Sequence, residues 1–420
     1  MTTSTCPYAI DVTGGDVHGE SAYLREQGRA TRVRLPGDVT AWWVTDQALV
    51  KQLLTDPRVS RDPYRHWPQW GNGESEFAQT WSLAMWVADR NMITAYGDEH
   101  KRLRKLVARA FTARRTAGLR PRIEEITEAL LGSLAKSPTG QPVDLRAQFA
   151  YPLPTQVISE LLGIPDDIRP GLLRSVHAIL DTTATPEEAK ANETVLYRLL
   201  HEVVTVKRGN PADDLISDLV LVRDDEGGVG LSERELVDTI LLMFTAGHET
   251  TVNLLDHAIH LLLTHPERLR AARSGELPWE DVVDEVLRLE APFANLPMRY
   301  AVEEIRLDDV TIAKGDPIVI AFGAAGRDPL VHGATADEFD PTRPTRKEHV
   351  SFGHGVHHCV GAPLARLEAT IGLPALFARF PEAALTEPER IRPLPSFISN
   401  GHAALPALLG EPAAPAVAAR

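Results

Sequence analysis

The chain has 420 residues, of which 43% are hydrophobic and 24% charged. This is the composition of an ordinary globular protein, and it excludes a disordered or fibrous one. The net charge of −14 opposes binding to nucleic acid and to anionic lipid, so neither is expected as a partner.

The sequence has no run of about 18 consecutive apolar residues, so no membrane-spanning helix is expected. It has two cysteines, Cys6 and Cys359, and such sparse usage favours a reducing compartment over a disulfide scaffold. Residues 1–11 carry no basic residue and no apolar block, so we expect no signal peptide and predict a cytoplasmic location. No repeat or linker divides the chain, which predicts a single domain over residues 1–420 whose Ala/Pro-rich tail, 410–420, frays.

The first predicted elements are a strand pair and a helix. Residues 32–35 and 41–45 flank a Pro-Gly-Asp turn, which is typical of paired strands. The pattern then predicts a helix over residues 46–54, with Thr45 or Asp46 as its N-cap.

A basic run follows within residues 101–115, where the sequence has no acid. Its members are Lys101, Arg102, Arg104, Lys105, Arg109, Arg114 and Arg115. Such a run is usually a solvated helix face. On an acidic protein it can also be a docking patch for an acidic partner, and composition alone does not decide between the two.

The longest predicted helix begins after a capping box formed by Ser232 and Glu235. It can continue to Thr264, because the following His-Pro pair stops it. A helix over residues 233–264 would be roughly 48 Å long, at about 1.5 Å per residue. Residues 240–244 are apolar on every face, so this helix is expected to run through the core.

A second strand cluster is predicted at residues 304–307, 310–312 and 317–322, with a turn at Asp308-Asp309. Nearly everything between the two strand clusters has a helical pattern. The sequence therefore predicts a mainly α fold with small β-sheets.

The clearest candidate site is a glycine-rich loop, Phe352-Gly353-His354-Gly355-Val356-His357-His358-Cys359-Val360-Gly361. Its glycines allow tight turns, so the chain can wrap closely around a flat group. Cys359 precedes a helical run, and a helix N-terminus favours a thiolate.

Three interpretations of this loop compete. A lone cysteine is usually structural. His354, His357, His358 and Cys359 are all zinc donors, although residues so close in sequence seldom all reach one tetrahedral ion. The third interpretation is a haem-thiolate site, which needs only the cysteine to touch the iron.

The loop resembles the haem-binding loop of the cytochrome P-450 family, Phe-x-x-Gly-x-His/Arg-x-Cys-x-Gly, and matches it at Phe352, Gly355, His357, Cys359 and Gly361. The resemblance covers roughly residues 11–409. It implies haem b (iron protoporphyrin IX) as cofactor, Cys359 as the iron ligand, and Phe352, Gly355 and Ala246 beside the haem. It also implies the cytochrome P-450 fold, in which a long central helix crosses the haem.

A second motif lies on the long helix, Ala246-Gly247-His248-Glu249-Thr250-Thr251. Gly247 costs about 1 kcal/mol against Ala in a helix, so it suggests close approach of another group. The ordinary alternatives are a surface acid at Glu249 and, at Thr250, a hydroxyl bonded to an upstream carbonyl. The segment resembles the family's oxygen-activation motif, which implies that Thr250 donates a hydrogen bond to dioxygen and Glu249 relays protons.

Two further sets of residues agree with the resemblance. Glu285 and Arg288 lie one helical turn apart and look like the family's structural Glu-x-x-Arg pair. A buried dianionic cofactor needs compensating cations. By resemblance these are His100, Arg104, Arg299 and His357.

The resemblance implies a monooxygenase that inserts one oxygen atom from O2 into a C–H bond, with electrons from a ferredoxin and its reductase. Short segments such as Trp42-Trp43-Val44 are similar to actinomycete members that oxidise macrolides, polyketides and steroids. The expected substrate is therefore a hydrophobic polycyclic or macrocyclic molecule. Ala246, Leu296, Phe397 and Ile398 are the expected contacts, although ordinary core packing explains each of them nearly as well.

Several alternatives stay open at this point. The same haem-thiolate enzyme could perform epoxidation or oxidative ring coupling in natural-product biosynthesis. A haem-based binding or sensor protein would share the loop without needing Glu249 and Thr250. A zinc hydrolase would use His357 or His358 with Cys359.

Overall fold

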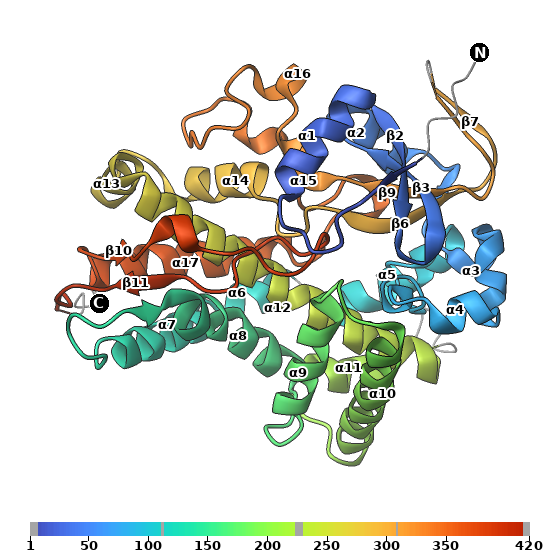
Figure 1. The fold of residues 1–420 in the computed structure, drawn as a ribbon. Coiled ribbons are helices and arrows are strands. Elements are labelled where there is room, and N and C mark those ends of the chain that lie inside the picture. The colour runs from blue at the N-terminus through green and yellow to red at the C-terminus, as the bar shows by residue number, and fades with distance from the viewer. Residues whose placement is uncertain (1–6, 111–112, 223–229, 308–309, 415–420) are drawn as a thin grey trace.

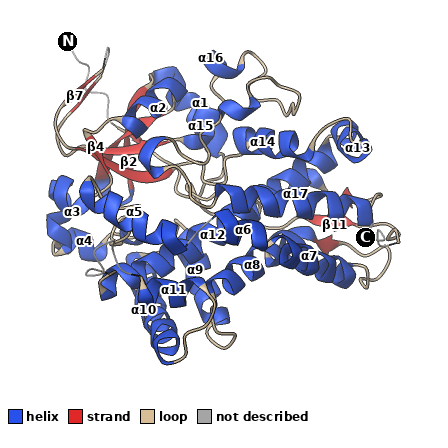
Figure 2. Ribbon diagram, turned by 180° about the vertical axis from the view of Figure 1, so that it is seen from behind, coloured by secondary structure: helices blue, strands red, loops and turns tan. Residues whose placement is uncertain are grey.

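The computed structural model describes residues 7–110, 113–222, 230–307 and 310–414. Helices make up most of it and strands form three small sheets, as predicted (Figures 1 and 2). The α-helices are α1 (Val17–Gln27), α2 (Gln47–Thr55), α3 (Pro63–His66), α4 (Glu76–Thr80), α5 (Asp98–Ala110), α6 (Ala113–Gly118), α7 (Arg120–Leu134), α8 (Pro152–Leu162), α9 (Arg169–Leu180), α10 (Pro186–Gly209), α11 (Leu215–Leu221), α12 (Glu233–Thr264), α13 (Pro266–Ser274), α14 (Trp279–Leu289), α15 (Phe322–Gly326), α16 (Pro329–His332) and α17 (Ala362–Arg379).

The largest sheet has six strands in the order β1-β2-β3-β9-β6-β4 and lies to one side of the molecule (Figure 2). A three-stranded sheet, β10-β11-β5, and a two-stranded sheet, β7-β8, complete the β-structure of the described residues. The strands are β1 (Tyr8–Ala9), β2 (Ala30–Leu35), β3 (Val39–Val44), β4 (Val59–Ser60), β5 (Val143–Asp144), β6 (Leu296–Ala301), β7 (Ile305–Arg306), β8 (Thr311–Ile312), β9 (Pro317–Ile320), β10 (Ala384–Leu385) and β11 (Pro406–Leu408).

The predicted N-terminal strand pair and helix are confirmed. Strands β2 and β3 pair antiparallel, with Leu35 opposite Val39. Asp46 caps α2, because its side chain accepts a hydrogen bond from the backbone N–H of Leu49.

The second strand cluster divides between two sheets. β7 and β8 pair only with each other, whereas β9 joins the large sheet between β3 and β6. Strand β6 was not predicted, because its Leu-Pro-Met-Arg-Tyr-Ala sequence has no clear alternation and five of its six residues are buried. The predicted turn at Asp308-Asp309 lies outside the described residues.

Helix α12 has the predicted bounds, Glu233–Thr264, and the predicted capping box at Ser232 and Glu235. It runs through the middle of the molecule, where it packs against α8, α14 and α17 (Figure 1). Ile240, Leu241, Met243 and Phe244 are buried, so the expectation that it crosses the core is confirmed. This helix is the element on which the candidate site is built.

No helix within the described ranges is long and apolar enough to cross a membrane. The structure describes residues 410–414 of the tail that was expected to fray. In this part, the Ala413 N–H donates to the Arg379 carbonyl at 2.9 Å. Residues 415–420 lie outside the described residues.

Candidate haem site

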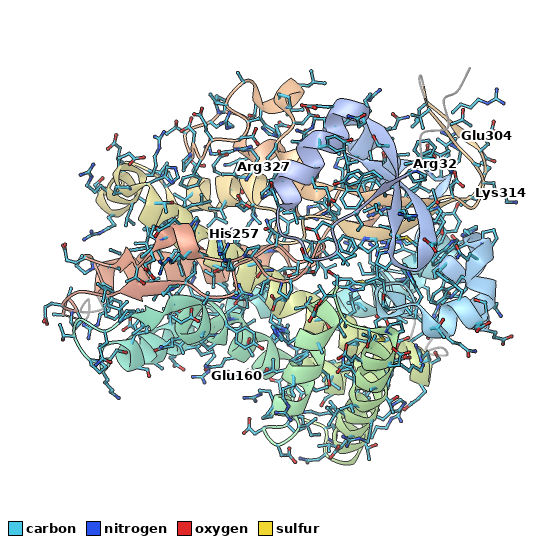
Figure 3. The ribbon with its side chains drawn as sticks, in the orientation of Figure 1. Arg32, Glu160, His257, Glu304, Lys314 and Arg327 are labelled. Carbon is cyan, nitrogen blue, oxygen red and sulfur yellow. The ribbon has the colours of Figure 1, made fainter. Side chains whose placement is uncertain are left out.

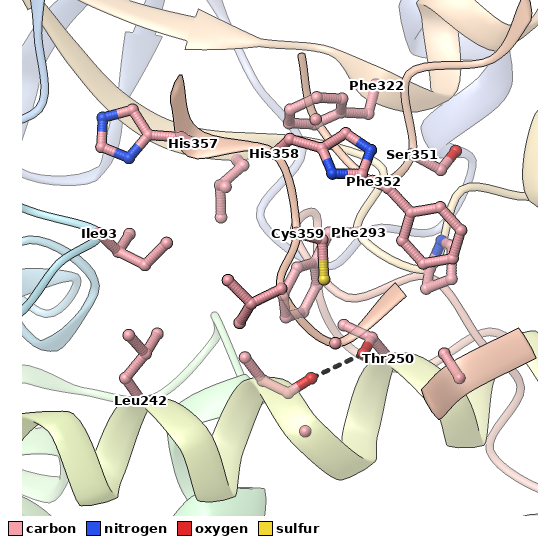
Figure 4. A pocket seen from close by; sticks show the side chains of 18 of the residues that line it. Ile93, Leu242, Thr250, Phe293, Phe322, Ser351, Phe352, His357, His358 and Cys359 are labelled. Carbon is pink, nitrogen blue, oxygen red and sulfur yellow. Dashed lines mark hydrogen bonds between the residues drawn. The ribbon is translucent and has the colours of Figure 1, made fainter. Parts of the chain in front are cut away.

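The site is a cavity between α12 and the cysteine loop. Its volume is about 1380 Å³ when the solvent-filled opening is included. Cys359 projects from the loop on one wall, and Thr250 stands on α12 on the opposite wall (Figure 4). Apolar side chains such as Leu242 and Phe293 make up most of the remaining lining. An apolar cavity with a few convergent polar groups is typical of a cofactor or small-molecule site.

The cysteine loop depends on glycine at two positions. Gly353 and Gly355 have φ values of +75° and +72°, which side chains rarely tolerate. A Cβ on Gly355 would also lie 2.9 Å from the Leu54 carbonyl oxygen at the end of α2. Gly361 does not serve as a left-handed turn, because it caps α17 with φ −84°.

Cys359 is held by its backbone, whose N–H donates to the Phe352 carbonyl at 2.8 Å. Its side chain opens into the cavity, which lies inside the protein. Burial therefore raises the pKa of the thiol, and hydrogen bonds from the backbone of Gly361 and Ala362 lower it only in part. A thiolate here needs further positive charge, which a coordinated metal ion supplies.

Cations gather at the cavity. Arg61, Arg104, Arg299 and His357 line it, and the ring of His100 lies 4.3 Å from the ring of His357. Burial lowers the pKa of Arg299 well below its ordinary value and that of Arg61 to about 10. Burial and the neighbouring cations lower the pKa of His357 to about 2.

These nitrogen donors lack anionic partners within the described part of the chain. No Asp or Glu lines the cavity. His100 Nε2, Arg299 Nη1, His357 Nδ1 and Arg61 Nε are buried without a hydrogen-bond partner. Unpaired buried donors are costly, so the donor set fits an anionic group such as the two propionates of haem.

Arg61 was missed by the sequence analysis. It follows β4, which pairs with β6 so that Ser60 lies opposite Tyr300. This pairing brings Arg61 to the same part of the cavity as Arg299. No local motif marks Arg61, and only the sheet topology could have found it.

The helical segment at residues 246–251 presents Thr250 to the cavity and Glu249 away from it. The Thr250 hydroxyl donates to the Ala246 carbonyl at 2.7 Å, which is the ordinary helical arrangement considered above. Glu249 is 1% exposed, is absent from the cavity lining, and accepts a hydrogen bond from Arg146 at 3.1 Å. It is thus a buried, ion-paired acid and not a surface one.

Gly247 has a packing explanation. A Cβ at this position would lie 2.7 Å from Cδ1 of Ile158 on α8. The glycine therefore permits close contact between α8 and α12, in addition to lining the cavity.

The expected substrate contacts separate into two groups. Ala246 and Leu296 line the cavity. Phe397 and Ile398 are fully buried and do not line it, and the Phe397 ring packs 6.4 Å from the Trp43 ring. Ordinary core packing explains these two residues, because they belong to the same buried apolar cluster as residues of the large sheet.

Among the described residues of the basic run, Lys101, Arg102 and Arg115 pair with acids, Lys101 with Asp98 at 2.8 Å. Arg102 pairs with Glu99 and Glu235, and Arg115 pairs with Asp218 at 2.5 Å. Arg104 instead turns to the cysteine loop, where it donates to the His358 carbonyl at 2.8 Å. The side chains of Arg109 and Arg114 lie outside the described residues.

Comparison with known proteins identifies the class. Residues 187–274 and 279–401 match the family model described as Cytochrome P450. The chain is 44% identical over 402 residues, 96% of its length and 97% of the relative's, to a 2-hydroxy-5-methyl-1-naphthoate 7-hydroxylase of Streptomyces carzinostaticus. The chain belongs to the cytochrome P450 family and is a haem-binding monooxygenase.

Solved structures agree with this assignment. CYP154A1 from Streptomyces coelicolor A3(2) is 50% identical with a TM-score of 0.90, over 96% of this chain and 100% of that one. CYP154C4 from Streptomyces sp. ATCC 11861, described as "testerone bound", is 42% identical with a TM-score of 0.92, over 98% of this chain and 100% of that one. The predicted fold, a cytochrome P450 with a long central helix, is confirmed.

Proposed function

We propose that this monooxygenase hydroxylates a hydrophobic polycyclic or macrocyclic small molecule in the cavity between Cys359 and Thr250. The observation that carries the proposal is the cavity itself, which is apolar, faces a lone cysteine and holds unpaired cations. Bound haem supplies the activation of O2 for insertion into a C–H bond. The protein's own residues hold the haem and orient the substrate.

Cys359 would ligate the iron through its sulfur. The propionates would pair with Arg104, Arg299 and Arg61 and accept hydrogen bonds from His100 and His357. Phe352, Gly355 and Ala246 would shape the protein surface next to the haem. Leu296 and Ala246 would contact the substrate. Phe397 and Ile398 are left out of this proposal, because their side chains are enclosed in the core.

The substrate class is supported by the lining and by two relatives. One relative is a naphthoate hydroxylase, and another is the protein described as "testerone bound". Both descriptions name fused-ring molecules, which suit an apolar cavity of this size. Epoxidation and ring coupling remain alternatives, since the same haem chemistry performs them.

Binding spectra of the haem-loaded protein test the substrate class. We expect steroids, macrolides or naphthoates to shift the Soret band at micromolar concentrations, while linear fatty acids of equal apolar area do not. Mass spectrometry of the turnover products then separates a hydroxylated product from an epoxide or a coupled ring. Selective binding of linear chains would contradict the proposed class.

For proton delivery, we propose that Thr250 donates a hydrogen bond to dioxygen in the cavity and that Glu249 passes protons toward it. Thr250 has the geometry to do so, since its hydroxyl can exchange the Ala246 carbonyl for a group in the cavity. Glu249 would act from behind the helix, where it pairs with Arg146 at 3.1 Å.

Replacing Thr250 with Ala is expected to lower the rate of product formation by about 100-fold, which is typical for loss of a positioned proton donor. Consumption of O2 should continue with release of peroxide. The measurement is product formed per O2 consumed, and Glu249→Gln should show the same uncoupling. Thr264→Ala is the matched control, because Thr264 makes the same bond to an upstream carbonyl, that of His260 at 2.9 Å, near the end of α12. Full coupling in Thr250→Ala would refute the role.

For electron transfer, we propose that a ferredoxin, reduced by its own reductase, docks beside α5. Arg104 on this helix contacts the cysteine loop, and Lys101 and Lys105 on the same helix are exposed. These exposed lysines share a helix with Arg104, which contacts the loop that carries Cys359, and this favours the docking interpretation of the basic run for an acidic partner.

Charge reversal tests this docking surface. Lys101→Glu together with Lys105→Glu should lower kcat/KM for ferredoxin by about tenfold at low salt, as expected when electrostatic steering is lost. Turnover driven by peroxide should not change. Lys190→Glu is the control, since Lys190 is an exposed lysine on α10. Equal losses in both assays would contradict the proposed surface.

A further inference from the structure

We propose that Asp256, His257 and His402 form a binding site for a divalent transition-metal ion, separate from the haem cavity. One potential ligand atom from each residue lies within 4.8 Å of those of the other two. No other group of His, Cys, Asp and Glu in the described ranges meets this criterion. None of the three residues lines the haem cavity. Asp256 and His257 lie on α12, and His402 belongs to the C-terminal loop (His257 is labelled in Figure 3).

The Asp256 carboxylate is the strongest part of the argument. It is fully buried. Its Oδ2 accepts the His402 backbone N–H at 2.8 Å and lies 2.9 Å from His402 Nδ1. Its Oδ1 is buried without any hydrogen-bond partner. A bare carboxylate oxygen in the interior is costly, and a bound cation would satisfy it.

The surrounding histidines are suitable ligands. The ring of His402 lies 4.8 Å from that of His257 and 4.6 Å from that of His260, which makes His260 the candidate for a fourth ligand. Imidazole nitrogens are among the commonest metal ligands in proteins.

The local charge also favours a cation. Arg146 lies 3.1 Å from Glu249 and 3.3 Å from Asp256, so two buried carboxylates share one guanidinium. A metal ion beside Asp256 would add positive charge to this pair of acids.

The donor set and the distances point to zinc or a similar ion. Imidazole with carboxylate is a common zinc combination. At bond lengths of about 2.0–2.1 Å, tetrahedral donors lie about 3.3 Å apart, so atoms now within 4.8 Å need only small side-chain rotations. His402 keeps 15% of its side chain exposed, which gives an ion a path of entry.

Calorimetric titration of the haem-loaded, chelator-treated protein with ZnCl2 tests the proposal. We expect one Zn²⁺ per chain, with binding weakened at least tenfold in His402→Ala and in Asp256→Asn. The control is His201→Ala, which removes an exposed histidine from α10 and should leave binding unchanged. Zinc-edge X-ray absorption should show nitrogen and oxygen donors and no sulfur, which distinguishes this site from Cys359.

A second measurement covers the case in which a variant folds poorly. Zn²⁺ should raise the melting temperature of the wild-type protein, because a ligand that binds only the folded state stabilises it, and should leave that of His402→Ala unchanged. Absence of binding to the wild type, or equal binding by His402→Ala, would overturn the proposal.

Discussion

Replacing Cys359 with His is expected to abolish the strongly red-shifted Soret band that the reduced protein should give with carbon monoxide. The shift requires a thiolate on the iron, because sulfur donates electron density that imidazole does not. Cys359 is the only cysteine in the described part of the chain, so no other thiol there can replace it. Substrate oxidation should fall to background in the same variant.

The control for this prediction is His354→Ala. His354 is an exposed zinc-type donor in the same loop, and its loss should leave both the spectrum and the activity intact. A colourless wild-type protein with one zinc per chain, sensitive to His354→Ala, would contradict thiolate-ligated haem and favour the zinc interpretation of the loop.

Replacing Arg288 with Ala is expected to lower the free energy of unfolding by about 3–5 kcal/mol, the usual result of removing one partner from a buried ion pair. Arg288 and Glu285 are both fully buried and paired at 2.8 Å. The guanidinium also donates to the carbonyls of Gly326 and Ala336, each at 2.7 Å. The variant leaves these carbonyls unpaired in the core, and it leaves Glu285 with only the Asp340 N–H at 3.0 Å and the longer Arg343 contact at 3.4 Å. Urea denaturation followed by circular dichroism measures the loss.

A surface pair provides the comparison. Arg208 and Glu233 also form an ion pair, at 2.6 Å, but each is about half exposed. Arg208→Ala should therefore cost no more than about 1 kcal/mol. Similar losses in the two variants would mean that the buried pair does not stabilise the fold in the proposed way.

The elements with local signals were predictable from the sequence. The bounds of α12 follow from a capping box at one end and a His-Pro pair at the other. The cysteine loop has fixed spacing and glycines that its backbone requires, as Gly355 shows. Such signals lie within a few residues of the feature that they predict.

The features that were missed depend on contacts between distant segments. Arg61 reaches the cavity only because β4 pairs with β6, and β6 itself lacks a strand pattern. Phe397 was expected in the cavity, but it lies against Trp43, more than 350 residues earlier in the chain. The pairing of Glu249 with Arg146 was also not predicted, because nothing near Glu249 in the sequence indicates it.

The guanidinium of Arg146 pairs with two carboxylates that lie two helical turns apart on α12. Glu249 adjoins the residue that faces the haem cavity, whereas Asp256 holds the C-terminal loop through His402. A change in the charge of either acid therefore alters the counterion available to the other, and by thermodynamic reciprocity the influence is equal in both directions. The effects of Glu249→Gln and Asp256→Asn on stability should accordingly not add. The C-terminal loop is in this way linked to the acid behind the cavity-facing side of the helix.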